Sequence, residues 1–245
     1  MVTIKCGNRT FSNIEAILFD KNGTLEDSEV YLRSLAQKVA RMVDAQVPGI
    51  GEPLLMAFGI DGTILDPAGL IAVASRRETE VAAAAYIAET GKGWFESLKI
   101  ARQALEEAEK YIGKTPSPLF VGSLEVLKSL KEAGLKLGIL SAASTSEVVN
   151  FVKNHQLNDY IQLEMGVDEG PSKPDPVLFI QACQKLGVEP SATLMVGDSA
   201  GDMQMAQNAG AAGCVGITWI GHSGNVLGAD VVIHQLEEIQ VTDVL

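Results

Sequence analysis

The chain has 245 residues, 47% of them hydrophobic and 20% charged, which is typical of a folded globular protein with a sizeable core. Its 31 acidic and 19 basic residues give a net charge of −12, which argues against nucleic acid or an anionic membrane as the main partner, because both bind positive surfaces. No apolar run has the length of a signal peptide or a membrane span, and the three cysteines form no CxxC pair. We therefore expect a cytoplasmic protein with reduced thiols.

Short apolar strands and amphipathic helices alternate along most of the chain. Residues 2–11, with Gly7-Asn8 in the middle, indicate a small hairpin attached to one edge of the sheet. Apolar runs, most of them without polar alternation, predict buried parallel strands at 15–20, 135–140, 161–164, 193–197, 213–217 and 230–233. Helical patterns occupy 123–133, 145–154, 175–186 and 201–209. This alternation predicts an α/β fold with a Rossmann-like, doubly wound parallel sheet.

The long segment after the first core strand has helical patterns and no strand signal. Helices are predicted from Ser28, as the N-cap, to about Ala45, over Arg77–Glu89, and over about Trp94–Ile112. We therefore predict two domains. Residues 1–27 and 115–245 form the α/β core, and residues 28–114 form an all-helical cap that acts as a lid over the sheet.

Polar side chains follow several of the predicted strands, at the edge where open α/β sheets bind ligands. The first core strand is followed by Asp20-Lys21-Asn22-Gly23-Thr24-Leu25 and the second by Ser141-Ala142. The third is followed by Ser172-Lys173-Pro174, and the fourth delivers Gly197-Asp198-Ser199-Ala200-Gly201-Asp202. Three carboxylates, one lysine and one hydroxyl are thus predicted to converge on one rim of the sheet.

These four segments, in order and spacing, resemble the four motifs of the haloacid dehalogenase superfamily. The helical insertion resembles the first-type cap of its phosphoglycolate phosphatase-like members. The resemblance implies hydrolysis of a small-molecule phosphate monoester through an aspartyl-phosphate on Asp20. It also implies the metal ligands, which are Asp20, Asp198, Asp202 (directly or through water) and the backbone carbonyl of Asn22. It implies a substrate-binding set of Thr24, Ser141, Ala142 and Lys173.

Physical chemistry supports this assignment. Asp20, Asp198 and Asp202 cannot all stay ionised at close range unless a cation lies among them, and oxygen ligands beside a phosphate favour Mg²⁺. Lys173 can neutralise both the phosphoryl group and Asp20. The amides after Ser141 precede a helix that Ser144 and Glu147 are predicted to cap, which makes an anion-binding corner. Taken alone, Lys173 fits a solvated helix-start lysine and Ser141 a turn residue. The ordered set favours the catalytic interpretation.

Asn22 departs from the family pattern, in which active phosphatases carry an aspartate two residues after the nucleophile. An amide cannot transfer a proton, and a positioned acid–base group contributes about 10²–10⁴-fold to a rate. Three interpretations follow: a slow phosphatase, an enzyme with a long-lived aspartyl-phosphate, or a disabled phosphate-binding or regulatory protein. We favour residual phosphatase chemistry, with the binding protein as the alternative.

Two features of the inserted segment complete the predictions. Residues 59–63 (GIDGT) imitate the nucleophile motif but follow no apolar strand, so we expect a turn of the lid rather than a second active site. Arg76, next to Arg77, is a candidate to bind a second acidic group of the substrate, although adjacent arginines more often form a solvated face. The predicted partner is a small phosphorylated metabolite, with neither nucleic acid nor a membrane.

Overall fold

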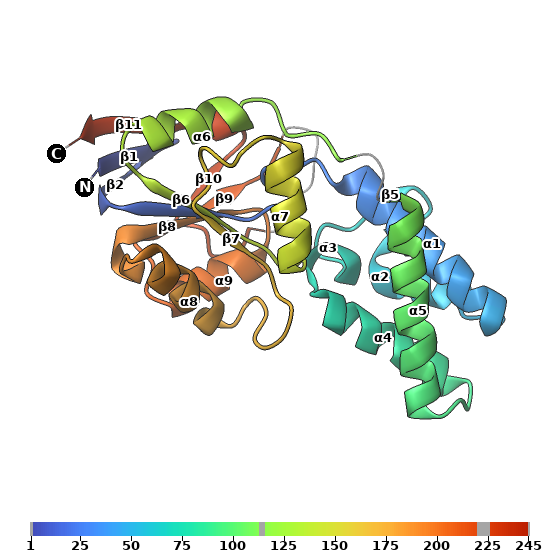
Figure 1. The fold of residues 1–245 in the computed structure, drawn as a ribbon. Coiled ribbons are helices and arrows are strands. Elements are labelled where there is room, and N and C mark those ends of the chain that lie inside the picture. Colours follow the sequence, from blue (N-terminus) through green and yellow to red (C-terminus); the bar gives the residue numbers. More distant parts are fainter. Residues whose placement is uncertain (1, 113–115, 220–225, 245) are drawn as a thin grey trace. The chain divides into compact units, whose positions relative to one another are not determined.

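A computed structural model describes residues 2–112, 116–219 and 226–244, which fall into two compact units (Figure 1). The first unit joins Met1–Asp27 to Pro118–Leu245, and the second is Ser28–Ser117. The boundary that the sequence predicts between 114 and 115 falls on residues outside those described.

A six-stranded parallel sheet forms the centre of the first unit. Its strands run in the order β10 (Val231–Ile233), β9 (Gly213–Ile217), β8 (Thr193–Gly197), β3 (Ala16–Phe19), β6 (Lys136–Leu140) and β7 (Leu163–Met165). Every neighbouring pair is parallel. The predicted α/β fold with a doubly wound parallel sheet is therefore confirmed, and all six predicted core strands are present.

Helices cover both faces of this sheet (Figure 1). Because successive strand residues point to opposite faces, Ile17 and Phe19 pack with α6 (Ser123–Glu132) and α7 (Thr145–Asn154). Ala16 and Leu18 pack on the other face with α8 (Pro176–Leu186) and α9 (Ala200–Asn208). All four residues of β3 are buried, which explains why this strand is apolar throughout.

The N-terminal hairpin does not join the edge of the parallel sheet. Strands β1 (Val2–Cys6) and β2 (Arg9–Ile14) form a separate sheet with β11 (Ile239–Val244), in the order β11-β1-β2. Both pairings are antiparallel. The expected place of the hairpin was wrong because no pattern in the C-terminal residues indicated the partner strand β11. Two short 3₁₀ helices, Pro190–Ala192 and Leu236–Glu238, complete this unit.

The second unit is mainly helical and has its own hydrophobic core. Its helices are α1 (Glu29–Gln46), α2 (Gly51–Phe58), α3 (Leu70–Val73), α4 (Arg76–Glu89) and α5 (Trp94–Ile112), of which α2 and α3 were not predicted. A small hairpin of β4 (Ile60–Asp61) and β5 (Ile64–Leu65) contradicts the expectation of no strand here. Ser28 occupies the N-cap position of α1, but its side chain makes no capping hydrogen bond. Within the described ranges, no helix is long and apolar enough to cross a membrane.

Candidate active site

The carboxyl ends of three adjacent strands carry the predicted polar residues. Asp20 follows β3, Ser141 follows β6, and Asp198 follows β8. The backbone N–H of Asp20 donates to the carbonyl of Val196 at 2.9 Å, which extends the pairing of β3 and β8 up to the site. Asp202 lies in the first turn of α9, and Lys173 lies in the loop before α8.

Asp20, Asp198 and Asp202 form one acidic cluster. Each offers a carboxylate oxygen, and these oxygens lie within 4.8 Å of one another. Asp20 and Asp202 are buried, and Asp198 is half-buried. Two glycines permit this approach. A Cβ at Gly23, where φ is +72°, would lie 2.0 Å from Asp198 Oδ2, and a Cβ at Gly197 would lie 2.5 Å from Asp202 Cγ.

Lys173 supplies a positive charge to this cluster. Its ammonium contacts Asp20 Oδ1 and lies 2.6 Å from Asp202 Oδ1. The other oxygen of Asp202 accepts a hydrogen bond from the Ser199 hydroxyl at 2.6 Å, as part of the capping box of α9. One carboxylate thus caps a helix with one oxygen and faces the site with the other. The structure brings Asp20, Lys173, Asp198 and Asp202 together as predicted from the sequence.

The electrostatics of the cluster favour a bound cation. Burial raises the pKa of Asp20 to about 6, against the opposing effect of the Lys173 ammonium. Burial, and then the charges of Asp20 and Asp202, raise the pKa of Asp198 well above its usual range. Burial alone would lower the pKa of Lys173, but the two neighbouring carboxylates outweigh it and raise that pKa. One lysine does not neutralise three carboxylates, so the cluster can hold a metal ion.

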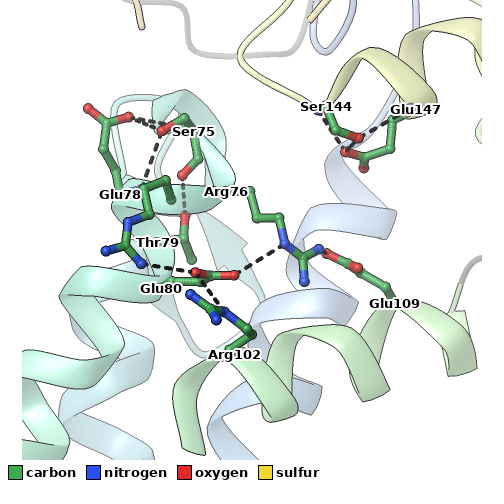
Figure 2. A network of polar contacts seen from close by, with 10 residues as sticks. Ser75, Arg76, Glu78, Thr79, Glu80, Arg102, Glu109, Ser144 and Glu147 are labelled. Carbon is green, nitrogen blue, oxygen red and sulfur yellow. Dashed lines mark hydrogen bonds and ion pairs between the residues drawn. The ribbon is translucent and has the colours of Figure 1, made fainter. Parts of the chain in front are cut away.

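The predicted anion-binding corner follows β6. Ser141 is buried, and its hydroxyl accepts a hydrogen bond from the Ala143 amide at 3.2 Å. Ala142 lies between them and is half-buried. Ser144 and Glu147 form the capping box that the sequence predicted for α7 (Figure 2). Thr24 is fully buried in the loop after Asp20, and its hydroxyl has no hydrogen-bond partner among the described residues.

The side chains of Lys21, Glu26 and Trp219 make contacts in the loop after Asp20 that were not predicted from the sequence. Lys21 contacts Asn22 Oδ1 and pairs with Glu26 Oε2 at 2.6 Å, and both members of this ion pair are buried. The indole N–H of Trp219 donates to the carbonyl of Gly23 at 3.0 Å. Two opposite charges five residues apart were the available signal for the ion pair. The Trp219 contact is distant in sequence and left no such signal.

Arg76 belongs to the second unit, where it starts α4. It pairs with Glu80 at 3.4 Å and also with Glu109, and Arg102 approaches the same Glu80 from α5 (Figure 2). The imitation motif at 59–63 spans the end of α2 and the turn between β4 and β5, where Asp61 and Gly62 are exposed. Arg33 holds this turn by donating to the carbonyl of Thr63 at 2.8 Å.

Comparisons with known proteins agree with this geometry. The family profile of haloacid dehalogenase-like hydrolases matches residues 14–210. A phosphoglycolate phosphatase of Vibrio vulnificus is 28% identical over 201 residues, covering 71% of this chain and 88% of that protein. An N-acetylmuramic acid 6-phosphate phosphatase of Pseudomonas putida is also 28% identical, over 247 residues that cover 94% and 96% of the two chains.

A solved structure shares the fold. A predicted phosphoglycolate phosphatase from Haemophilus somnus superposes with a TM-score of 0.67 at 22% identity, over 92% of this chain and 96% of that chain. The profile match spans most of the 245 residues and includes Asp20, Lys173, Asp198 and Asp202. The chain therefore belongs to the haloacid dehalogenase-like hydrolases.

Proposed function

We propose that this protein is a Mg²⁺-dependent phosphatase that hydrolyses a small phosphate monoester through an aspartyl-phosphate on Asp20. One observation carries the proposal. A buried carboxylate contacts a buried lysine inside an acidic cluster able to hold a metal ion. The lysine relieves the repulsion between the carboxylate and an incoming anion, and phosphoryl transfer depends on such positioning and charge neutralisation.

Two displacements complete the reaction. A carboxylate oxygen of Asp20 attacks phosphorus, the bond from phosphorus to the ester oxygen breaks, and the alcohol leaves after taking a proton. Water then attacks the aspartyl-phosphate, the bond from phosphorus to the Asp20 oxygen breaks, and inorganic phosphate is released. The phosphoryl oxygens are proposed to be bound by Lys173, the Ser141 and Thr24 hydroxyls and the Ala142 amide. Asn22 cannot donate the proton to the alcohol, so solvent is its proposed source.

The proposed ligands of Mg²⁺ are Asp20, Asp198, Asp202 and the backbone carbonyl of Asn22. The donor set fits, because this ion binds carboxylate and carbonyl oxygens, and the cluster is short of positive charge. Bound there, the ion would supply electrostatic stabilisation to the transferring phosphoryl group.

We propose a phosphorylated acid as the substrate class. The two curated relatives described above are named for phosphoglycolate and for N-acetylmuramic acid 6-phosphate, and both names describe a phosphate ester that also carries a carboxylic acid. Arg76 is proposed to meet that acid. Arg76→Ala should then raise the KM for phosphoglycolate but not for para-nitrophenyl phosphate, whereas Arg77→Ala, which removes another partner of Glu80, should leave both unchanged.

The enzyme is tested by para-nitrophenyl phosphate hydrolysis with and without Mg²⁺. Turnover should require Mg²⁺ and disappear in Asp20→Asn, while the exposed-site control Asp159→Asn keeps the wild-type rate. Acid quenching during turnover should trap phosphate on the wild-type protein and not on Asp20→Asn. Turnover retained in Asp20→Asn would remove the nucleophile assignment.

The amide at position 22 favours a second candidate, a disabled phosphate-binding or regulatory protein. Tight binding of a phosphate analogue without Mg²⁺-dependent turnover would establish that alternative. If the enzyme is only slowed by the missing acid–base group, Asn22→Asp should raise turnover at least about tenfold. An unchanged rate in this variant would show that another group supplies the proton.

A further inference from the structure

Lys21 occupies an unusual place for a lysine, next to Asp20 and inside the core of the first unit. Its side chain is 8% exposed, and the side chain of its partner Glu26 is 10% exposed. The ammonium lies 2.6 Å from Glu26 Oε2, contacts Asn22 Oδ1, and stands 5.7 Å from the centre of the Phe151 ring of α7. The side chains of Asn22 and Glu26, in the loop after Asp20, are therefore joined through the buried Lys21 ammonium.

The chemistry of lysine fixes the orientation of the Asn22 amide. An ammonium group has three donors and no acceptor, so it must face the amide oxygen and not the NH₂ group. The NH₂ group of Asn22 therefore points away from Lys21. Position 22 then offers a hydrogen-bond donor of fixed direction, where an aspartate would offer acceptors.

Stability of the loop does not account for the ion pair. The loop is already closed by its backbone, because the amides of Leu25 and Glu26 donate to the carbonyl of Lys21 at 3.0 and 2.9 Å. The Gly23 amide also donates to the carbonyl of Glu26 at 2.9 Å. A buried ion pair is no more stabilising, as a rule, than an apolar pair of similar volume. What the Lys21–Glu26 pair adds to these bonds is the contact with Asn22.

We propose that Lys21, held by Glu26, is a positioning residue that fixes Asn22 as a hydrogen-bond donor beside the phosphoryl group carried by Asp20. The expected effect on kcat rests on the proposed function. The orientation of the Asn22 amide rests on the contacts alone. In this role Asn22 stabilises negative charge on phosphoryl oxygen by donation and transfers no proton.

A double-mutant cycle tests the positioning role. Lys21→Met/Glu26→Met removes both charges and leaves neither buried alone, and Asn22→Ala removes the amide to be positioned. The charge-removing pair should lower kcat about tenfold when Asn22 is present and have no effect in the Asn22→Ala background, a coupling within the usual range for contacting residues. Equal effects in both backgrounds, or none in either, would overturn the proposal.

A matched control separates this role from general loss of charge. Lys92→Met/Glu96→Met removes an ion pair of similar length, 2.7 Å, that lies in the cap with side chains 31% and 56% exposed. It should leave kcat and KM unchanged. Glu26→Gln keeps an oxygen acceptor for Lys21 and should retain kcat within about threefold. A loss of kcat in Glu26→Gln as large as in the double variant would contradict an orienting contact.

The orientation itself is measured without turnover. In the metal-free wild-type protein, NMR should show nuclear Overhauser contacts from the Lys21 ε-protons to Glu26 but not to the side-chain NH₂ protons of Asn22. Strong contacts to that NH₂ group would overturn the assignment even if no variant folds. If wild-type turnover is absent while the NMR result holds, the proposed function has failed and the positioning of Asn22 has not.

Discussion

The three carboxylates of the acidic cluster make the stability of the protein depend on pH. The pKa of Asp20 is raised by burial to about 6, above its usual value of about 3.9. Its contribution to the stability of the metal-free protein is therefore complete below about pH 4 and is lost as the pH rises through about 6. Above that pH Asp20 is ionised, so protons compete less with a cation for the cluster.

We therefore expect Mg²⁺ to raise the Tm more at pH 7.5 than at pH 5. Differential scanning calorimetry at constant ionic strength measures the two shifts. Asp198→Asn is the matched variant, because it removes one charge from the cluster and should shrink the shift at pH 7.5. A Mg²⁺-induced shift of equal size at both pH values would contradict proton competition at this site.

Two features of position 23 require glycine: its backbone angle and the space that Asp198 occupies beside it. Its φ of +72° costs a substituted residue about 1–2 kcal/mol, and its Cβ would also lie 2.0 Å from Asp198 Oδ2. Gly62 has a φ of +57° with nothing within 4 Å of an added Cβ. A substitution there therefore has the cost of the backbone angle without a steric clash.

Gly23→Ala should lower Mg²⁺ affinity at least about tenfold because Asp198 must move, whereas Gly62→Ala should only lower the Tm. Isothermal titration calorimetry with Mg²⁺ distinguishes them. Wild-type affinity in Gly23→Ala would show that the metal site tolerates displacement of this carboxylate.

At the scale of elements, the predicted strands and long helices were largely right, for a physical reason. Strands buried on both faces, such as β3 and β8, consist almost wholly of apolar residues, and this leaves a recognisable run in the sequence. The elements missed are short or depend on distant partners. Helix α3 has four residues, β4 has two, and β11 pairs with β1 from the opposite end of the chain.

The same distinction between local sequence pattern and distant contact applies to the candidate site. Asp20, Asp198 and Lys173 were predictable because parallel strands end at one edge of the sheet. The contacts of Lys21 and Trp219 were not, because they depend on side-chain packing around the loop and not on chain order. The same limit applies to helix starts: a serine before a helix marks the position of the cap, but only the structure shows whether its hydroxyl is used.

Ser144 and Ser28 differ in whether the hydroxyl caps the helix, and this difference can be measured. Ser144 accepts from the Glu147 amide at the start of α7, while Ser28 precedes α1 without a capping hydrogen bond. Ser144→Ala should lower the free energy of unfolding by about 1 kcal/mol, and Ser28→Ala by less than about 0.5 kcal/mol. Urea denaturation followed by circular dichroism measures both. An equal loss in the two variants would show that the hydroxyl at the cap of α7 contributes nothing specific.

At the scale of the whole molecule, the two units bury their apolar side chains separately. The clusters on the two faces of the sheet make up the core of the first unit, and a third cluster makes up the core of the second. The second unit is inserted after Asp27, so the first unit is made from two stretches of sequence that the insertion separates. Each core has its own fully buried aromatic anchor, Phe58 in the second unit and Phe179 in the first. All three cysteines belong to the first unit and are buried there. Thiol labelling therefore reports on the opening of the first unit.

The two cores should respond separately to a cavity. Burial, reinforced by neighbouring acidic groups, raises the pKa of Cys6 and of Cys214 to about 12, so their thiols react only when the structure opens. Phe179→Ala costs the first core about 3–5 kcal/mol and should accelerate thiol labelling at pH 8 by about a hundredfold or more. Phe58→Ala makes a similar cavity in the second core and should leave the labelling rate within about twofold of wild type, because each unit buries its own apolar side chains. Equal acceleration by both variants would mean that the insertion and the α/β unit open as one cooperative structure.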